Sequence, residues 1–341
     1  MKKKLIGLLS MLLLTFLLAA CGGDDATEDT STSDSESSTE SSDGEEGSEA
    51  TEGLETNIVT IATGGASGPY NIIASSLAEI YSSEFDVNSR TQTTGASVEN
   101  INLLAQEKVE MAFVMSDALT QAINGEVNFE EPIENVSQIA SLYPNVVQII
   151  TPADSGIETI EDLVGKRVAV GDQNSGVEVN ARTLLNGHGI TYDDIEVDYL
   201  GYAEAADGLR AGQIDAAFLT SGLPNASVLE LSETGDISLA SINAEKIEEI
   251  AQEHPYFIAY DIPADTYGNE EAVATAAVPN ALVVRSDMSD DDVYQLTKVF
   301  FENLGTLENA HQAASDISLE GAQESMIAPV HPGAQRYYDE Q

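Results

Sequence analysis

Ile58-Val-Thr-Ile-Ala-Thr-Gly-Gly-Ala-Ser-Gly-Pro-Tyr70 is the stretch that decides the fold, because an apolar run, a loop of small residues and a helical pattern follow one another in it. The run 58–63 predicts a strand, and apolar side chains at helical spacing over 70–85 predict a helix. The same order recurs along the chain. Strands that alternate with helices are typical of βαβ units, so the sequence predicts an α/β fold.

These units form two similar sets. The third predicted strand of each set has the same pattern, since Lys108-Val-Glu-Met-Ala-Phe113 resembles Gln213-Ile-Asp-Ala-Ala-Phe218. Two α/β lobes joined by crossing segments enclose a cleft, and the Gly/Ser loops at the carboxyl ends of the strands are expected to face it. The predicted strands are 58–63, 85–92, 111–115, 168–171, 195–200, 214–219 and 237–242, and the predicted helices are 70–85, 98–107, 117–124, 177–187, 203–212, 290–304 and 307–315.

Two apolar segments cross between the sets and define the lobes. Residues 136–150 are long and apolar with an interruption at Pro144, and residues 275–284 can return the chain to the first set. We therefore expect lobe 1 over 57–147 and lobe 2 over 148–274. A return crossover and C-terminal helices over 275–341 would complete lobe 1.

The N-terminus resembles a targeting segment. Three lysines precede an apolar run over 5–18, which is too short for a comfortable membrane span. Leu18-Ala-Ala-Cys21-Gly resembles a bacterial lipobox, so we expect a lipoprotein signal peptide over 1–20 and lipidation of Cys21. The alternative is an ordinary secretory signal with a chance cysteine. Either way the mature chain would be extracytoplasmic, and lipidation would anchor it to the cell membrane.

Residues 21–56 predict an acidic, disordered tether. Thirteen acidic residues and no basic one lie between 22 and 56, with almost no apolar side chain. Such a segment cannot bury enough surface to offset its ordering entropy, and like charges keep it extended. An acidic tail that binds another protein is the alternative.

The charge of the chain excludes several classes of protein. The 341 residues carry 13 Lys+Arg against 59 Asp+Glu, a formal net charge of −46. Nucleic-acid binding is excluded because such a surface repels phosphates. It repels anionic lipid too, so membrane attachment would be through the lipid anchor only. A single Cys excludes an internal disulfide framework and a thiolate metal site.

Three loops could form an anion site. Thr63–Tyr70, Thr93–Asn100 and Gly171–Glu178 each place Gly and Ser directly before a predicted helix. The first N–H groups of a helix lack partners there, and the helix dipole favours an anion. Three such helix starts facing one cleft could hold an anion without a basic side chain.

A purely structural interpretation of these loops is that their serines cap the helices. Ser175 fits it best, because Glu178 three residues later completes a capping box, whereas Ser67 and Ser97 lack that partner.

Motifs of catalysis are missing from the sequence. It contains no H-E-x-x-H and no G-x-S-x-G, and the globular part has no S-x-x-K. The four histidines are scattered, and the many acid pairs are most simply a solvated surface. We therefore expect no enzyme, no metal and no cofactor.

The globular part, from about Ile58 to the C-terminus, resembles the TAXI family of TRAP-associated extracytoplasmic solute receptors. The resemblance rests on Thr63–Tyr70, Thr94–Ile101, Leu142-Tyr-Pro-Asn-Val-Val-Gln148, Ser175–Arg182 and His331-Pro-Gly-Ala-Gln-Arg-Tyr-Tyr338. It implies a two-lobed periplasmic-binding-protein type II-like fold with a ligand cleft between the lobes. It also implies capture of a small organic anion, such as glutamate or 2-oxoglutarate, and its delivery to a sodium-coupled TRAP permease.

The resemblance also implies which residues touch the ligand. They come from the first two loops, the crossover and the third loop: Gly65, Ala66, Ser67, Tyr70, Thr94, Gly95, Ser97, Tyr143, Asp172, Gln173, Asn174, Ser175, Gly176 and Val177. This chain has Asn174-Ser-Gly-Val177 where the family usually has Gly-Ser-Gly-Thr, which leaves the ligand's identity open.

Several alternatives to this interpretation remain open. Arg90 and Arg182 could contact the ligand, although a surface or structural role is favoured for both. We expect a monomer. A membrane-tethered sensor that presents the solute to a signalling partner is the main alternative function, and an extracytoplasmic enzyme is the second.

Overall fold

The computed structural model describes residues 53–235 and 237–341. The predicted signal peptide, Cys21 and the predicted tether up to residue 52 lie outside the described residues. Within those ranges no helix combines the length and the apolar character needed to cross a membrane.

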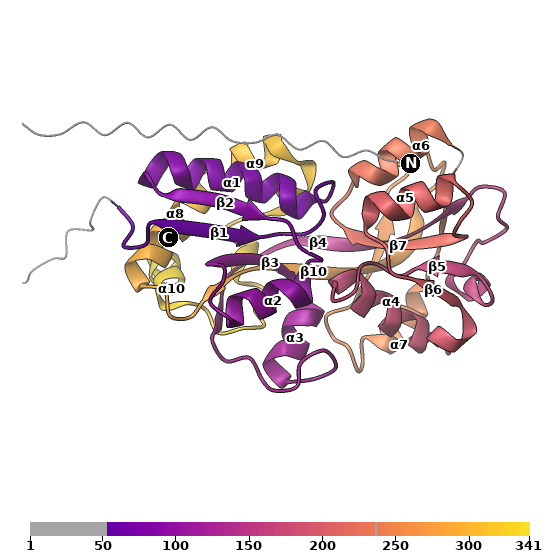
Figure 1. The fold of residues 1–341 in the computed structure, drawn as a ribbon, viewed down its shortest axis with the longest axis horizontal. Coiled ribbons are helices and arrows are strands. Elements are labelled where there is room, and N and C mark those ends of the chain that lie inside the picture. Colours follow the sequence, from indigo (N-terminus) through magenta and orange to yellow (C-terminus); the bar gives the residue numbers. More distant parts are fainter. Residues whose placement is uncertain (1–52, 236) are drawn as a thin grey trace, which may run out of the picture. The chain divides into compact units, whose positions relative to one another are not determined.

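One mixed sheet runs through the described part of the chain, and helices cover it (Figure 1). Its strand order is β2-β1-β3-β10-β4-β7-β5-β6, with β8 added to β4 and β9 to β10. The strands are β1 (Ile58–Ala62), β2 (Asn88–Gln92), β3 (Met111–Met115), β4 (Val136–Pro152), β5 (Arg167–Ala169), β6 (Glu196–Asp198), β7 (Ala216–Ser221), β8 (Ile237–Ala240), β9 (Ile258–Ile262) and β10 (Val273–Arg285). The helices are α1 (Pro69–Phe85), α2 (Ser97–Ala105), α3 (Ser116–Asn124), α4 (Gly176–Gly187), α5 (Tyr202–Arg210), α6 (Ala226–Thr234), α7 (Ala244–Ile250), α8 (Asp290–Glu302), α9 (Leu304–Ala310) and α10 (Pro332–Asp339).

The predicted α/β fold is confirmed, and both βαβ sets are present. In the first lobe, built on β1 to β3 with α1 to α3, β1 pairs in parallel with β2 and β3. In the second lobe, built on β5 to β9 with α4 to α7, β5 pairs in parallel with β6 and β7. The carboxyl ends of β1 and β5 therefore lead into the first and third Gly/Ser loops.

The strands β4 and β10 belong to both lobes. β10 pairs with β9 over 273–277 and with β3 over 280–284, while β4 pairs with β7 over 146–150. The expected boundaries near 147 and 275 thus fall inside continuous strands. Pro144 does not interrupt β4, because it lies opposite Pro279 of β10. Neither proline can donate a backbone hydrogen bond, so this pair gives the ladder no N–H donor at the crossover.

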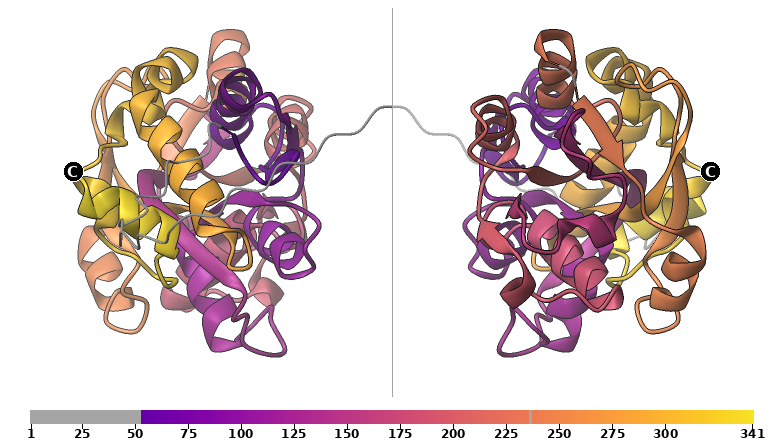
Figure 2. Two further views of the ribbon diagram at one scale, coloured as in Figure 1. Left: turned by 90° about the vertical axis from the view of Figure 1, so that its left-hand side faces the viewer. Right: turned by 90° about the vertical axis from the view of Figure 1, so that its right-hand side faces the viewer.

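Each lobe has its own apolar core. Ile73 and Leu77 of α1 pack with Phe300 of α8 in the first, and Leu184 of α4 packs with Phe218 of β7 in the second. The C-terminal helices α8 to α10 cover the same end of the protein as α1 (Figure 2).

The sequence patterns missed α6, α7, β9 and α10. The three helices are short, and caps rather than periodicity mark their starts: Asn225 accepts an N–H bond at α6, Asn243 accepts two at α7, and His331 accepts one at α10. The end of the predicted tether also differs. The N–H groups of Glu55 and Thr56 donate to the buried Asp292 at 2.6 and 3.0 Å, which attaches these residues to α8.

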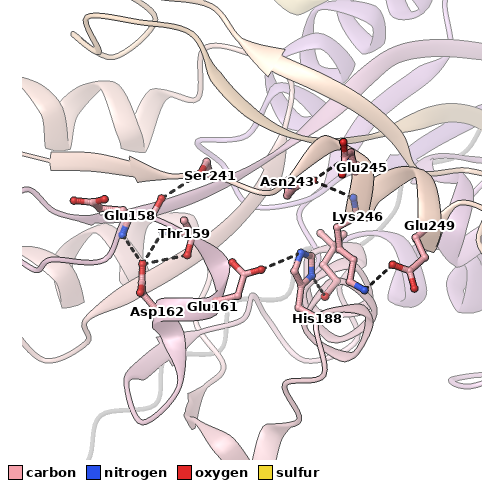
Figure 3. Close-up of polar contacts among 11 residues, drawn as sticks. Glu158, Thr159, Glu161, Asp162, His188, Ser241, Asn243, Glu245, Lys246 and Glu249 are labelled. Carbon is pink, nitrogen blue, oxygen red and sulfur yellow. Dashed lines mark hydrogen bonds and ion pairs between the residues drawn. The ribbon is translucent and has the colours of Figure 1, made fainter.

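A polar cluster in the second lobe stabilises helix ends (Figure 3). Thr159 and Asp162 form a capping box, and Lys246 pairs with Glu249 at 2.7 Å on α7. The His188 ring lies 3.9 Å from Glu161. No group of three or more potential metal ligands occurs in the described ranges.

Candidate functional site

A cavity of about 40 Å³ lies between the two lobes. One water needs about 10–15 Å³ by this measure, so the cavity has room for roughly three waters. Its lining comes from all three predicted loops, the crossover, the ends of β3 and β7, and the segment after β6: Gly64, Gly65, Gly68, Pro69, Tyr70, Gly95, Ala96, Met115, Asn145, Gly171, Asp172, Ser175, Val177, Leu200, Gly201, Tyr202 and Ser221.

The first loop supplies backbone donors at the cavity. The N–H of Gly68 closes a turn on the carbonyl of Gly65 at 2.9 Å, and α1 then starts at Pro69. Within the described part of the chain, no hydrogen bond engages the N–H groups of Gly65, Ala66 and Ser67. These N–H groups precede a helix of 17 residues, so the helix dipole reinforces their attraction for an anion.

The floor of the cavity is a buried polar network. Tyr70 donates its hydroxyl to Asn280 and accepts the amide of Asn145 at 3.1 Å. The other atom of the Asn145 amide group, Oδ1, has no partner within residues 53–235 and 237–341, and neither has the hydroxyl of Tyr143. Burial, followed by the nearby Tyr143 and Tyr202, raises the pKa of Tyr70 well above its usual value, so this phenol stays neutral.

In the second loop, side chains of the loop accept hydrogen bonds from the loop's own backbone N–H groups. Glu99 accepts the N–H of Gly95 at 2.7 Å, and the hydroxyl of Thr94 accepts the N–H of Ala96 at 3.0 Å. Ser97 is fully buried and accepts the N–H of Met115 at 3.0 Å. Thr94 and Ser97 therefore fix the loop and do not line the cavity. Ser97 is not the helix cap either, since that position is Ala96.

The third loop has a real N-cap. Ser175 accepts the N–H of Glu178 at 3.1 Å, as the capping interpretation predicted. The reciprocal half of the predicted capping box is absent from the described contacts of Glu178, because its carboxylate pairs with Arg182. Gly171 has a φ of 94° and faces Val177 so closely that a Cβ would lie 2.6 Å from it. Only glycine fits there.

The lobes touch at the mouth of the cavity. The hydroxyl of Ser227 on α6 donates to that of Ser67 at 2.9 Å, and the N–H of Glu99 donates to the carbonyl of Asn174 at 3.3 Å. Gly176 of α4 packs directly on Ser97. The structure is therefore a closed arrangement of the cleft.

The predicted contact residues divide into two groups. Gly65, Tyr70, Gly95, Asp172, Ser175 and Val177 line the cavity, whereas Ala66, Ser67, Thr94, Ser97, Tyr143, Gln173, Asn174 and Gly176 lie beside it. Gln173, Asn174 and Ala66 are exposed.

The cavity lining includes one carboxylate, Asp172, and no Lys or Arg. Burial, and then the nearby Glu204 and Glu99, raise the pKa of Asp172 above its usual value. Arg90 is exposed on β2, and Arg182 is paired with Glu178. Backbone N–H groups are thus the principal positive groups available to a ligand.

Sequence reasoning missed several lining residues. Leu200, Gly201 and Tyr202 follow β6, and Tyr202 donates its hydroxyl to the carbonyl of Thr220 at 2.7 Å. Their position after a parallel strand was a usable signal. Asn145 lies inside the quoted motif 142–148, but only the pairing of β4 with β10 shows that it reaches the cavity floor.

Solved structures with this fold are known. The structure of periplasmic binding protein BugD superposes with a TM-score of 0.54 at 12% identity, over 83% of this chain and 94% of that one. A protein from Bordetella bronchiseptica RB50 gives 0.53 at 17% identity, over 84% and 90%. A structure described as a periplasmic transporter gives 0.53 at 14%, over 84% and 93%. The chain therefore has the two-lobed periplasmic-binding-protein fold.

The family follows from the sequence. The profile of the NMT1-like family matches residues 61–341, and the chain belongs to this family.

Proposed function

We propose that the protein is an extracytoplasmic solute-binding receptor that captures a small carboxylate, of the glutamate or 2-oxoglutarate kind, by closing its lobes over it. The observation that carries the proposal is the interlobe cavity, bordered by the first loop with its three unengaged N–H groups. The two-lobed fold and the absence of catalytic motifs from the sequence support it.

A carboxylate would bind at the start of α1. Hydrogen bonds from N–H groups to an ionised carboxylate are short and stronger than neutral ones. Tyr70 and Asn145 would orient the rest of the solute from the floor, where Asn145 Oδ1 offers an acceptor. The cavity of about 40 Å³ is small for a five-carbon dicarboxylate. The loaded cleft would therefore be somewhat wider than the one described.

Delivery would follow from the difference between the open and closed shapes. The pair Pro144 and Pro279 gives the ladder no N–H donor, so the lobes would rotate about this crossover. Only the closed, loaded receptor would then present one composite surface to a permease. The resemblance to TAXI receptors suggests a sodium-coupled TRAP permease. Lipidation at Cys21 would hold the receptor at the cell membrane near it.

The test is calorimetric titration with L-glutamate, 2-oxoglutarate and glutarate, using the chain with Cys21→Ser. At least one should bind at micromolar concentration. Asp172→Asn should then tighten binding of 2-oxoglutarate or glutarate severalfold, because it removes a negative charge from the lining and neither solute carries a positive group. Arg90→Gln changes an exposed residue outside the lining and should leave affinity unchanged.

Two results would count against a carboxylate site. The first is no heat of binding with any of the three solutes. The second is weaker binding of 2-oxoglutarate or glutarate in Asp172→Asn, because neither solute has a positive group that the Asp172 carboxylate could receive.

A further inference from the structure

A buried acid–amide pair joins the two lobes. Asp117 lies in the first turn of α3 in the first lobe, and Asn180 lies on α4 in the second. Both side chains are fully buried. The Asn180 amide donates a hydrogen bond to Asp117 Oδ2, which is a direct contact between the lobes beside the ligand cavity.

Two atoms of this pair lack partners. Asp117 Oδ1 and Asn180 Oδ1 are both buried, and neither has a hydrogen-bond partner among the described residues. Both are acceptors when the carboxyl group is ionised, so neither can satisfy the other. A single proton on the carboxyl group changes this, because a carboxylic acid and a primary amide can form two hydrogen bonds with each other.

We propose that Asp117 is a proton-binding site that takes up one proton when the lobes close. The proton satisfies both orphan acceptors and removes a negative charge from an interface where no cation of residues 53–235 and 237–341 pairs with it. A buried ionised carboxylate without a cationic partner is costly, and neutralisation is the usual outcome.

The surroundings of Asp117 support a neutral acid. Burial raises its pKa to about 7, and the first N–H groups of α3 offset only part of that effect. Tyr70 and Tyr256 are the ionisable side chains that interact with it, and burial raises the pKa of both phenols.

The remaining charged groups on the packed elements do not supply a counter-ion. Helix α3 packs on α2, α4, β3 and β10. Glu99 is the charged residue of α2, Glu178 and Arg182 are those of α4, and Arg285 is that of β10. Glu126 follows α3, and His254 lies in the segment before β9. Arg182 is already paired with Glu178, and Arg285 lies at the far end of β10 beside Asp287. Strand β3 carries no charge.

The sign of the pH effect follows from linkage. An aspartate in water has a pKa of about 3.9, so between about pH 4 and 7 the buried form holds a proton that the hydrated form has lost. The closed arrangement then becomes less favourable by about tenfold per pH unit across that window and levels off above it. Solute capture should then weaken as pH rises. Only this last expectation rests on the proposed function.

The experiment needs no solute, so its failure is separate from failure of the proposed function. Urea unfolding of the chain with Cys21→Ser is measured at pH 5, 6, 7 and 8, alone and with Asp117→Asn. The folding equilibrium constant of the unsubstituted chain should fall about fiftyfold relative to Asp117→Asn between pH 5 and 7. Asp154→Asn, at an exposed aspartate, should follow the unsubstituted chain. If the folding equilibrium constants of the unsubstituted chain and of Asp117→Asn change with pH in parallel, the proposal is overturned.

A second measurement covers the case in which Asp117→Asn does not fold. Carbon-13 NMR of the aspartate carboxyl groups in the otherwise unsubstituted chain should show one resonance that titrates close to pH 7. If every aspartate carboxyl has completed its titration by pH 5, the proposal is wrong.

Discussion

Gly176 offers the sharpest test of lobe closure. It is the first residue of α4 in the second lobe, and it packs across the interface on two first-lobe residues. A Cβ at this position would lie 2.8 Å from the hydroxyl of Ser97 and 3.0 Å from the sulfur of Met115. Gly176→Ala therefore introduces a clash that exists only when the lobes are closed.

The size of the effect follows from how far these neighbours can move. The Met115 side chain is flexible, but the Ser97 hydroxyl is short, fully buried and engaged with a backbone N–H. Overpacking of this kind costs about 1–3 kcal/mol. Since about 1.4 kcal/mol is a factor of ten, the ratio of closed to open molecules should fall roughly fivefold to a hundredfold. The fold of each lobe should survive, because the atoms nearest the new methyl group belong to Ser97 and Met115 of the first lobe, across the interface from α4.

Spin-label distance measurements give a direct assay. Labels at Ser83→Cys on α1 and Glu196→Cys on β6 are exposed and lie on opposite lobes, and Cys21→Ser removes the native thiol. Gly176→Ala should shift the distance distribution towards longer values. Gly305→Ala is the matched control, because its Cβ would meet nothing within 4 Å. An unchanged distribution in Gly176→Ala, with unfolding like that of the control, would refute the closed packing described.

Two further predictions concern residues outside the proton site. Ser97→Ala leaves the buried N–H of Met115 without an acceptor and should lower the free energy of unfolding by about 1–3 kcal/mol, as measured by urea unfolding. Burial lowers the pKa of His331, which accepts an N–H at the start of α10, so its neutral form stabilises the fold. Stability should therefore fall as the pH drops from the ordinary histidine pKa of about 6.5 towards the lower pKa of His331 in the folded protein. In melting experiments at pH 5 and 7, His331→Asn should reduce that loss of stability.

Each of these predictions has a clear contradiction. Equal stability of Ser97→Ala and the unsubstituted chain would mean that water reaches the Met115 N–H. If the His331→Asn chain loses as much stability between pH 7 and pH 5 as the unsubstituted chain, groups other than His331 cause that loss.

The strands and helices could be predicted from the sequence because burial follows the local periodicity of apolar residues. The run Met111–Met115 is buried at every residue, and α1 places its apolar side chains on one face. The continuity of β4 through Pro144 could not be predicted from the sequence. It depends on the pairing of Pro144 with Pro279, more than a hundred residues later, which no local pattern in the sequence shows.

The candidate site was predictable at the level of loops but not of side chains. All three Gly/Ser loops border one cavity. Within them, Ser97 accepts the N–H of Met115, and Ser67 bonds to Ser227 on the other lobe. These partners are distant in sequence, so no local motif could show that the hydroxyls are already engaged.

The acid–amide pair is a similar case. Asp117 reads as an ordinary helix-start residue and Asn180 as a polar position in an amphipathic helix. Only the approach of α3 to α4 shows that both are buried and in contact. Interlobe contacts of this kind are set by the crossover of β4 and β10, which lies outside both segments.

The most direct test of the account is a crystal structure of the protein with a bound carboxylate solute. We expect one carboxylate group within hydrogen-bond distance of the N–H groups of Gly65, Ala66 and Ser67, with the rest of the solute between the lobes against Tyr70 and Asn145. A solute bound elsewhere, or one whose carboxylate lies away from the start of α1, would contradict it.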